Sequence, residues 1–284
     1  MGQKRTYREI MDQSEDNKAV SPFLSMFETF RAELDEHHDR RERVIKASRD
    51  ITAASKKIAR ALKQTIPQGI QKANKQYYEI ISAQYNAVSK DLQGLDAYRY
   101  SGQITGGNQE FMEAASFQYY LERQSLISLE ESRAKLHGFI GESGSLMLTL
   151  DDYLLGIFDM TGELMRFAIT AMATNGELPG GESRNKPFPN SADDMDVDAI
   201  EMPAATLPQR NVLADLRQLR SCLEGLDVGG NGRLARDMEK KTEVMRVCVE
   251  KVERALYGLI IRGRERPKGW IPMDEGGRQE VESH

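Results

Sequence analysis

The sequence predicts an all-α protein, a single seven-helix bundle with long antiparallel helices. Three observations support this fold class. No stretch of useful length alternates apolar and polar residues as a β-strand would. Apolar residues recur at three- and four-residue spacing through long segments without Pro or Gly, the longest being 23–64. Pro and Gly fall between these segments, where helices are expected to end.

The first predicted helix covers 21–64 and begins with Ser21 and Pro22, which are favoured at the N-cap and first helical positions. Its length of about 44 residues corresponds to about 66 Å. Such a helix is more typical of a long bundle than of a compact globule. Pro67 and Gly69 interrupt the pattern, and a second helix is expected over about 68–92.

Three glycines, at positions 102, 106 and 107, predict a loop before the third helix, 108–124. Ser128 and Glu131 have the spacing of a capping box, which predicts that a short fourth helix begins there and ends near 138. The fifth helix, about 151–174, is the most apolar stretch of the chain. We therefore expect it at the centre of the bundle.

The sixth and seventh helices are expected over about 209–226 and 233–262, with a glycine-rich turn between them. The segment 176–208, which precedes the sixth helix, contains five prolines and most of its charges are acidic. This composition predicts a disordered insertion. The chain is thus divided into a flexible tail (1–20), one helical domain (21–268) that carries the insertion, and a second flexible tail (269–284).

Composition excludes several classes of protein. No apolar run reaches the ~18 residues of a membrane span, and no apolar segment follows the N-terminus, so we expect neither membrane association nor a secretory signal. Two cysteines exclude a disulfide framework and fit a reducing, intracellular compartment. The localisation that we expect, cytoplasm and nucleus, goes beyond this and rests on the family resemblance given below. The net charge of −5 resides in 176–206, with seven acidic and two basic residues. The remainder is balanced, so a nucleic-acid partner stays open.

Two predicted helices place carboxylates on apolar faces. Glu110 and Glu113 lie about 60° apart on the third helix, beside Ala114 and Phe117. The fifth helix groups Asp152, Asp159, Glu163 and Arg166 on one stripe, near Gly156 and Gly162. Acids in such places need neutralisation. One interpretation is a structural network with bases such as Arg166; the other is a divalent cation with oxygen ligands, Mg²⁺ or Mn²⁺.

A basic sector runs along the first helix. Residues 40–63 contain nine basic and two acidic residues. The sector could be a solvated face or a track for a phosphate backbone. Its members are Lys46, Arg49, Lys56, Lys57, Arg60 and Lys63.

These stretches resemble the translin superfamily. The resemblance covers about 21–174 and 209–268, and its most specific part is the fifth helix, where 152–156 and 159–166 match the family pattern. The insertion at 176–208 departs from it. Further matching stretches are 30–35, 38–39, 48–52, 109–118, 125–128, 255–257 and 262–263.

The resemblance implies a seven-helix bundle that joins translin in a hetero-oligomer and binds single-stranded RNA, or single-stranded DNA. It further implies the catalytic subunit of a Mg²⁺-dependent endoribonuclease, with Mn²⁺ as an alternative ion, acting in passenger-strand removal or transfer-RNA processing. The family's catalytic and metal-binding carboxylates match Glu110, Glu113 and Asp159, with Glu163 as a further metal ligand. Arg166 is expected either to pair with the acidic residues or to contact an RNA phosphate. Two other interpretations stay open, a non-catalytic scaffold that stabilises translin and a coiled-coil adaptor without RNA affinity.

Overall fold

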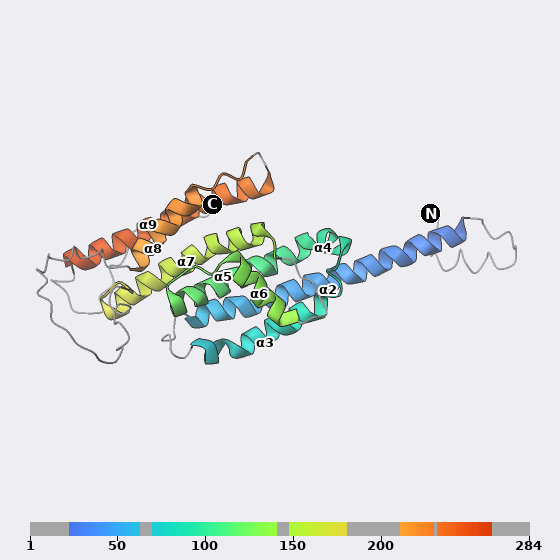
Figure 1. Ribbon diagram of the computed structural model, residues 1–284, viewed down its shortest axis with the longest axis horizontal. Coiled ribbons are helices and arrows are strands. Elements are labelled where there is room, and N and C mark those ends of the chain that lie inside the picture. Colours follow the sequence, from blue (N-terminus) through green and yellow to red (C-terminus); the bar gives the residue numbers. More distant parts are fainter. Residues whose placement is uncertain (1–22, 63–69, 141–147, 181–210, 230–231, 263–284) are drawn as a thin grey trace, which may run out of the picture.

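The computed structural model describes residues 23–62, 70–140, 148–180, 211–229 and 232–262, and within these ranges it is built of helices without strands (Figure 1). The all-α prediction is therefore confirmed. None of the helices in these ranges is long and apolar enough to cross a membrane. The helices are α2 (Leu24–Leu62), α3 (Ile70–Val88), α4 (Leu95–Arg99), α5 (Ser101–Arg123), α6 (Leu129–Ile140), α7 (Leu150–Asn175), α8 (Val212–Glu224) and α9 (Arg233–Arg262).

The longest helix, α2, is buried over its second half only. Val44, Ile51 and Ile58 of this half are fully buried at helical spacing. The first half projects beyond the bundle in Figure 1 and exposes Phe27 and Leu34. The helix is therefore both a core element and an extended arm.

The middle of the bundle is formed by α5, which packs on α2 along one side and on α7 along the other. The hairpin of α8 and α9 lies over α7 (Figure 1), while α3 packs on α2 and α6 packs on α3. The nearly all-round apolar sequence of α7 has the expected consequence, because Leu155, Ile157 and Phe158 are buried on different faces of the helix.

The capping box is present as predicted. The backbone N–H of Ser128 donates to Glu131 Oε2 at 2.8 Å, and the backbone N–H of Glu131 donates to Ser128 Oγ at 3.1 Å. These reciprocal bonds satisfy two of the donors that a helix start leaves open. They fix the beginning of α6.

The glycines at 102, 106 and 107 do not form a loop, and this expectation was wrong. They lie within the first turns of α5. A Cβ on Gly107 would lie 3.0 Å from Ser48 Oγ and 3.1 Å from Ser48 Cα, so this glycine lets α5 approach α2 closely. The short helix α4, absent from the sequence prediction, precedes α5 and makes the described helices eight in number.

The predicted tails, 1–20 and 269–284, lie outside the described residues, as does residue 21 with its predicted N-cap role. Most of the predicted insertion also lies outside them. Its first residues, to Gly180, are described, and Leu178 packs against the core. The backbone N–H of Val212 donates to the Pro179 carbonyl at 3.1 Å. Pro179, near the start of the insertion, therefore lies beside the first residue of α8.

Candidate functional site

Four of the predicted acids lie on two helices that pack together. Glu110 and Glu113 project from α5, and Asp159 and Glu163 from α7. Glu163 is buried, and the other three are half-buried. The two pairs face one another across the helix contact closely enough to interact electrostatically. We call these four residues the carboxylate cluster.

Gly156 lets the two helices meet beside this cluster. A Cβ at this position would lie 2.5 Å from Met112 Cβ, 2.9 Å from the Gln109 carbonyl oxygen and 3.3 Å from the Glu113 nitrogen. Any larger residue would push α7 away from α5. Gly162 differs, because its added Cβ would meet only the Arg166 guanidinium at 4.0 Å.

Basic side chains from three helices neutralise three of the four acids. Lys56 of α2 lies 3.1 Å from Glu110 Oε1. Arg166 pairs with Glu163 on the same helix. Lys241 of α9 pairs with Asp159.

Glu113 is the member of the cluster that has no ion pair among the described residues. Burial raises the pKa of its carboxyl from the usual 4.5 to about 8, and the negative charges of Glu110, Glu163 and Asp159 add to the shift. The nearby Arg166 opposes it in part. Glu113 therefore holds a proton near neutral pH unless a further positive charge enters the cluster.

Asp152 does not belong to the cluster, although it shares the predicted stripe of α7. It is buried in the first turn of α7, away from the cluster. Its carboxylate accepts hydrogen bonds from Thr105 Oγ1 and from Asn108 Nδ2, the latter at 2.9 Å. Its own backbone N–H donates to Thr149 Oγ1 at 3.0 Å, which caps α7. Its role is to join α5 to the start of α7.

The donor chemistry of the cluster suits a hard divalent cation, because all four side chains offer carboxylate oxygen. The side-chain positions are those of an ion-pair network, however. Within the described ranges, no group of three or more His, Cys, Asp or Glu is placed as a ready-made metal site. The ion pairs are those that the structural-network interpretation expects. The divalent-cation interpretation stays a prediction, and it requires these ion pairs to open before the oxygens can share a cation.

The predicted basic sector lies on the exposed side of α2. Lys46, Arg49, Lys57 and Arg60 point to solvent, and the Lys57 ammonium lies 5.8 Å from the centre of the Tyr77 ring. Lys63 falls outside the described residues. Lys56 differs from the others because its partner is Glu110. Through this contact the basic sector of α2 reaches the carboxylate cluster.

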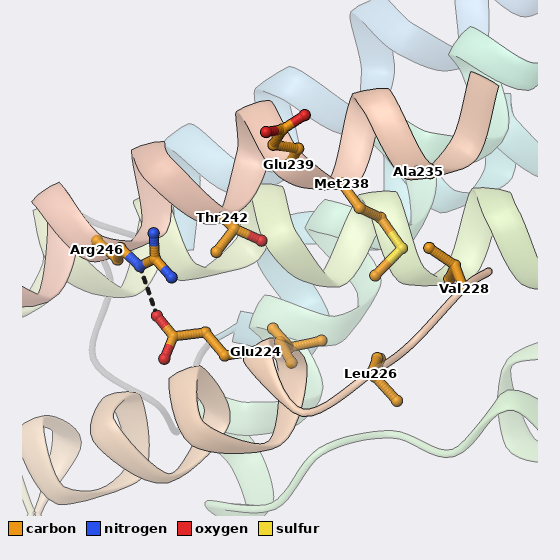
Figure 2. Close-up of a pocket in the computed structure, with 9 residues that line it drawn as sticks. Glu224, Leu226, Val228, Ala235, Met238, Glu239, Thr242 and Arg246 are labelled. Atoms are coloured by element: carbon orange, nitrogen blue, oxygen red, sulfur yellow. Dashed lines mark hydrogen bonds and ion pairs between the residues drawn. The ribbon is translucent and has the colours of Figure 1, made fainter. Parts of the chain in front are cut away.

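A separate cavity of about 200 Å³ lies between α8 and α9 (Figure 2). Two of its polar side chains are paired with each other, since Arg246 Nε donates to Glu224 Oε1 at 2.7 Å. None of its lining residues belongs to the carboxylate cluster. It is lined by Leu223, Glu224, Leu226, Val228, Ala235, Met238, Glu239, Thr242 and Arg246.

Sequence reasoning missed Lys241. A signal for it exists, because Lys241 occupies a position in the row formed by Met238, Met245, Cys248 and Val252, all of which are buried. Alternate spacings of three and four along this row mark the face that α9 turns towards α7. A lysine there indicates an acidic partner on the neighbouring helix, but the sequence does not say which acid.

Comparison with known proteins gives a consistent family assignment. A model described as the Translin family matches residues 39–263. Translin-associated protein X of Rattus norvegicus is 30% identical over 279 residues, covering 90% of this chain and 84% of the relative. The Translin-associated protein X homolog of Schizosaccharomyces pombe is 32% identical over 151 residues, covering 51% of this chain and 61% of the relative.

Solved structures show a similar fold. The crystal structure of AfC3PO aligns with a TM-score of 0.53 at 17% identity, covering 83% of this chain and 97% of that one. The structure of AfC3PO in complex with duplex RNA aligns with a TM-score of 0.50 at 18% identity, covering 85% and 100%. At this level of identity the likeness concerns the arrangement of helices.

Proposed function

Because the chain belongs to the Translin family, we propose that it is the catalytic subunit of a hetero-oligomer with translin. The proposed activity is Mg²⁺-dependent hydrolysis of phosphodiester bonds in single-stranded RNA, with Mn²⁺ as an alternative ion. Passenger-strand removal in RNA silencing and transfer-RNA processing are the proposed settings, in cytoplasm and nucleus. Single-stranded DNA is a second proposed ligand.

One observation carries this proposal, the contact between the basic sector of α2 and the carboxylate cluster. An RNA backbone that follows exposed cations such as Arg49 and Arg60 would pass the Lys56–Glu110 pair. Phosphates are thereby led towards the place where oxygen ligands are concentrated. A nuclease needs both features side by side, and neither feature alone would favour cleavage over binding.

In this proposal Glu110, Glu113 and Asp159 hold the metal ion, and Glu163 holds it as a further ligand. When bound, the ion would supply a water of lowered pKa and would stabilise negative charge on the phosphate. Residues of α7 position the site. Gly156 keeps α5 and α7 close enough for acids from both to act together, and Arg166 is exposed enough to turn from Glu163 to an RNA phosphate.

The comparisons support the RNA-binding and complex-forming parts of the proposal. The relatives are named for association with translin, and one structural neighbour was solved with duplex RNA. A non-catalytic scaffold that stabilises translin and carries RNA is the second candidate. The ion pairs on Glu110, Asp159 and Glu163 favour it, because acids that are already neutralised need no metal.

The deciding experiment uses the chain co-purified with a translin partner, a labelled single-stranded RNA and a titration of Mg²⁺ against EDTA. We expect cleavage that requires Mg²⁺ and is lost in Glu113→Gln and Asp159→Asn while RNA binding persists. Glu239→Gln is the matched control, since this exposed acid lies outside the cluster. RNA binding without cleavage at any Mg²⁺ concentration would establish the scaffold instead.

A further inference from the structure

Lys241 stands out because it is charged in an otherwise apolar row of α9. Met238, Met245 and Cys248 on the same row are buried, whereas the Lys241 side chain is 26% exposed. Lysine can bury its aliphatic stem and keep its ammonium at the surface. The row thus holds the stem in place and delivers the charged end to a particular point of α7.

That point is Asp159. The pair joins residues far apart in sequence, and Asp159 is itself 38% exposed. Both partners remain accessible to solvent, so the ion pair can open without uncovering the core. Asp159 is also one of the proposed metal ligands, and a carboxylate oxygen cannot bond an ammonium and a divalent cation equally well at once.

Charge balance then determines what the ammonium does when a cation binds. A divalent cation together with Lys56 and Arg166 balances the four negative charges of the carboxylate cluster, so Lys241 is no longer needed for neutralisation. Lys56 and Arg166 already serve the Glu110 and Glu163 ends of the cluster. In a complex with RNA, a backbone phosphate drawn to the same cation would offer the displaced Lys241 ammonium a new negative partner.

We propose that Lys241 is a phosphate-contacting residue of the site, held by Asp159 in the free protein and transferred to the RNA backbone when Mg²⁺ occupies the carboxylate cluster. This inference rests on the proposed function and adds α9 to the RNA-binding surface. In this proposal the Lys241 ammonium contacts RNA only when the metal ion is bound.

The salt dependence of RNA binding tests this exchange. Each phosphate that a cation neutralises on a single strand contributes about 0.7 to the slope of log affinity against log salt concentration. The full chain, in complex with its translin partner, is titrated with a nuclease-resistant 2′-O-methyl oligonucleotide in Mg²⁺ and in EDTA. We expect Lys241→Gln to reduce the slope by about 0.7 in Mg²⁺ and to leave it unchanged in EDTA.

Lys240→Gln is the control, because Lys240 is exposed on the adjacent position and the substitution removes the same charge. It should leave the metal-dependent difference intact. If the glutamine variant folds poorly, Lys241→Met replaces it, because a methionine packs well beside the neighbouring methionines. Lys241→Arg keeps the positive charge and should retain the phosphate contact. Equal slopes for Lys241→Gln and wild type in Mg²⁺ would overturn the proposal, as would an equal reduction in EDTA.

A second arm needs no metal. Asp159→Asn removes the partner of Lys241, so in EDTA this variant should show a slope about 0.7 steeper than wild type. Adding Lys241→Gln should cancel the increase, whereas adding Lys240→Gln should not. If the complex cleaves no RNA but shows these changes in salt slope, the proposed enzyme activity is refuted and the Lys241 contact is supported. If the complex cleaves RNA but shows no such changes in slope, the enzyme activity is supported and the Lys241 contact is refuted.

Discussion

At the scale of single residues, Glu113 and Asp159 respond differently to loss of charge. The pKa of Glu113 is raised in the folded protein, so its proton is bound more tightly there than in the unfolded chain. The stabilising effect is complete below about pH 4.5 and is lost as pH rises through about 8. Wild type should therefore become less stable over this range, and Glu113→Gln should lack that part of the decline.

Urea unfolding of both proteins at intervals between about pH 5 and pH 9 measures this effect. The variant should match wild type at the acid end and exceed it at the alkaline end. Mg²⁺ should stabilise wild type more than the variant, since a ligand that binds only the folded state adds to its stability. If the unfolding free energies of the two proteins change in parallel with pH, the raised pKa of Glu113 is contradicted.

Asp159→Asn provides the contrast, because Asp159 has a base as partner. The substitution leaves the Lys241 ammonium partly buried beside a neutral amide. We expect a loss of about 1 to 2 kcal/mol of unfolding free energy at pH 7, between the values for exposed and buried pairs. A double variant with Lys241→Met should recover most of the loss, and failure to recover it would show that the pair is not the cause.

At the scale of helices, the contact of α5 with α7 depends on Gly156. Gly156→Ala should destabilise the protein by about 1 to 3 kcal/mol, because the new methyl group would overlap Met112 Cβ and the Gln109 carbonyl. Gly162→Ala is the matched control on the same helix and has open space around it. It should be neutral or gain up to about 1 kcal/mol from helix propensity. Equal effects in thermal unfolding would show that the close approach is not needed.

The basic sector of α2 is tested by Arg49→Glu with Arg60→Glu. Neither arginine has an ion pair among the described residues, so the change removes positive charge without stranding an acid. RNA affinity should fall, and its salt dependence should flatten by about 0.7 for each phosphate that the variant no longer neutralises. Arg254→Glu on the exposed face of α9 is the comparison. An unchanged salt slope would mean that the sector is merely solvated.

The helices show which sequence signals are sufficient. The capping box at Ser128 and Glu131 predicted a helix start because both of its hydrogen bonds are local. The glycines at 102–107 were misread because their meaning depends on α2, with Ser48 lying against Gly107. Lys241 was missed for the same reason, since its acidic partner lies on another helix. Interactions between residues close in sequence can be predicted from the sequence, whereas the pairing of distant side chains is known only once the packing of the helices is known.

At the scale of the whole molecule, the resemblance to the translin superfamily is confirmed by the family match and by relatives that span most of the chain. The described helices nevertheless leave large apolar side chains exposed, and most of these lie on or next to α2 and α9. The projecting half of α2 exposes Met26, Phe27, Phe30 and Leu34, and Phe23, directly before the helix, is exposed as well. The outer side and C-terminal end of α9 expose Val244, Tyr257, Ile260 and Ile261. Contiguous exposed apolar surface indicates association with other proteins.

The final prediction is that the isolated chain self-associates and that co-expression with translin yields a stable complex of defined size. Burial of exposed apolar area drives association, at about 25 cal/mol per Å² before the entropic cost of association is subtracted. Sedimentation of the chain alone and with translin measures both states. Replacing Phe27 and Phe30 on the projecting arm with Ser should weaken assembly while leaving the melting of the bundle nearly unchanged, because neither side chain contributes to the core. A monodisperse monomer at micromolar concentration that does not bind translin would contradict the prediction.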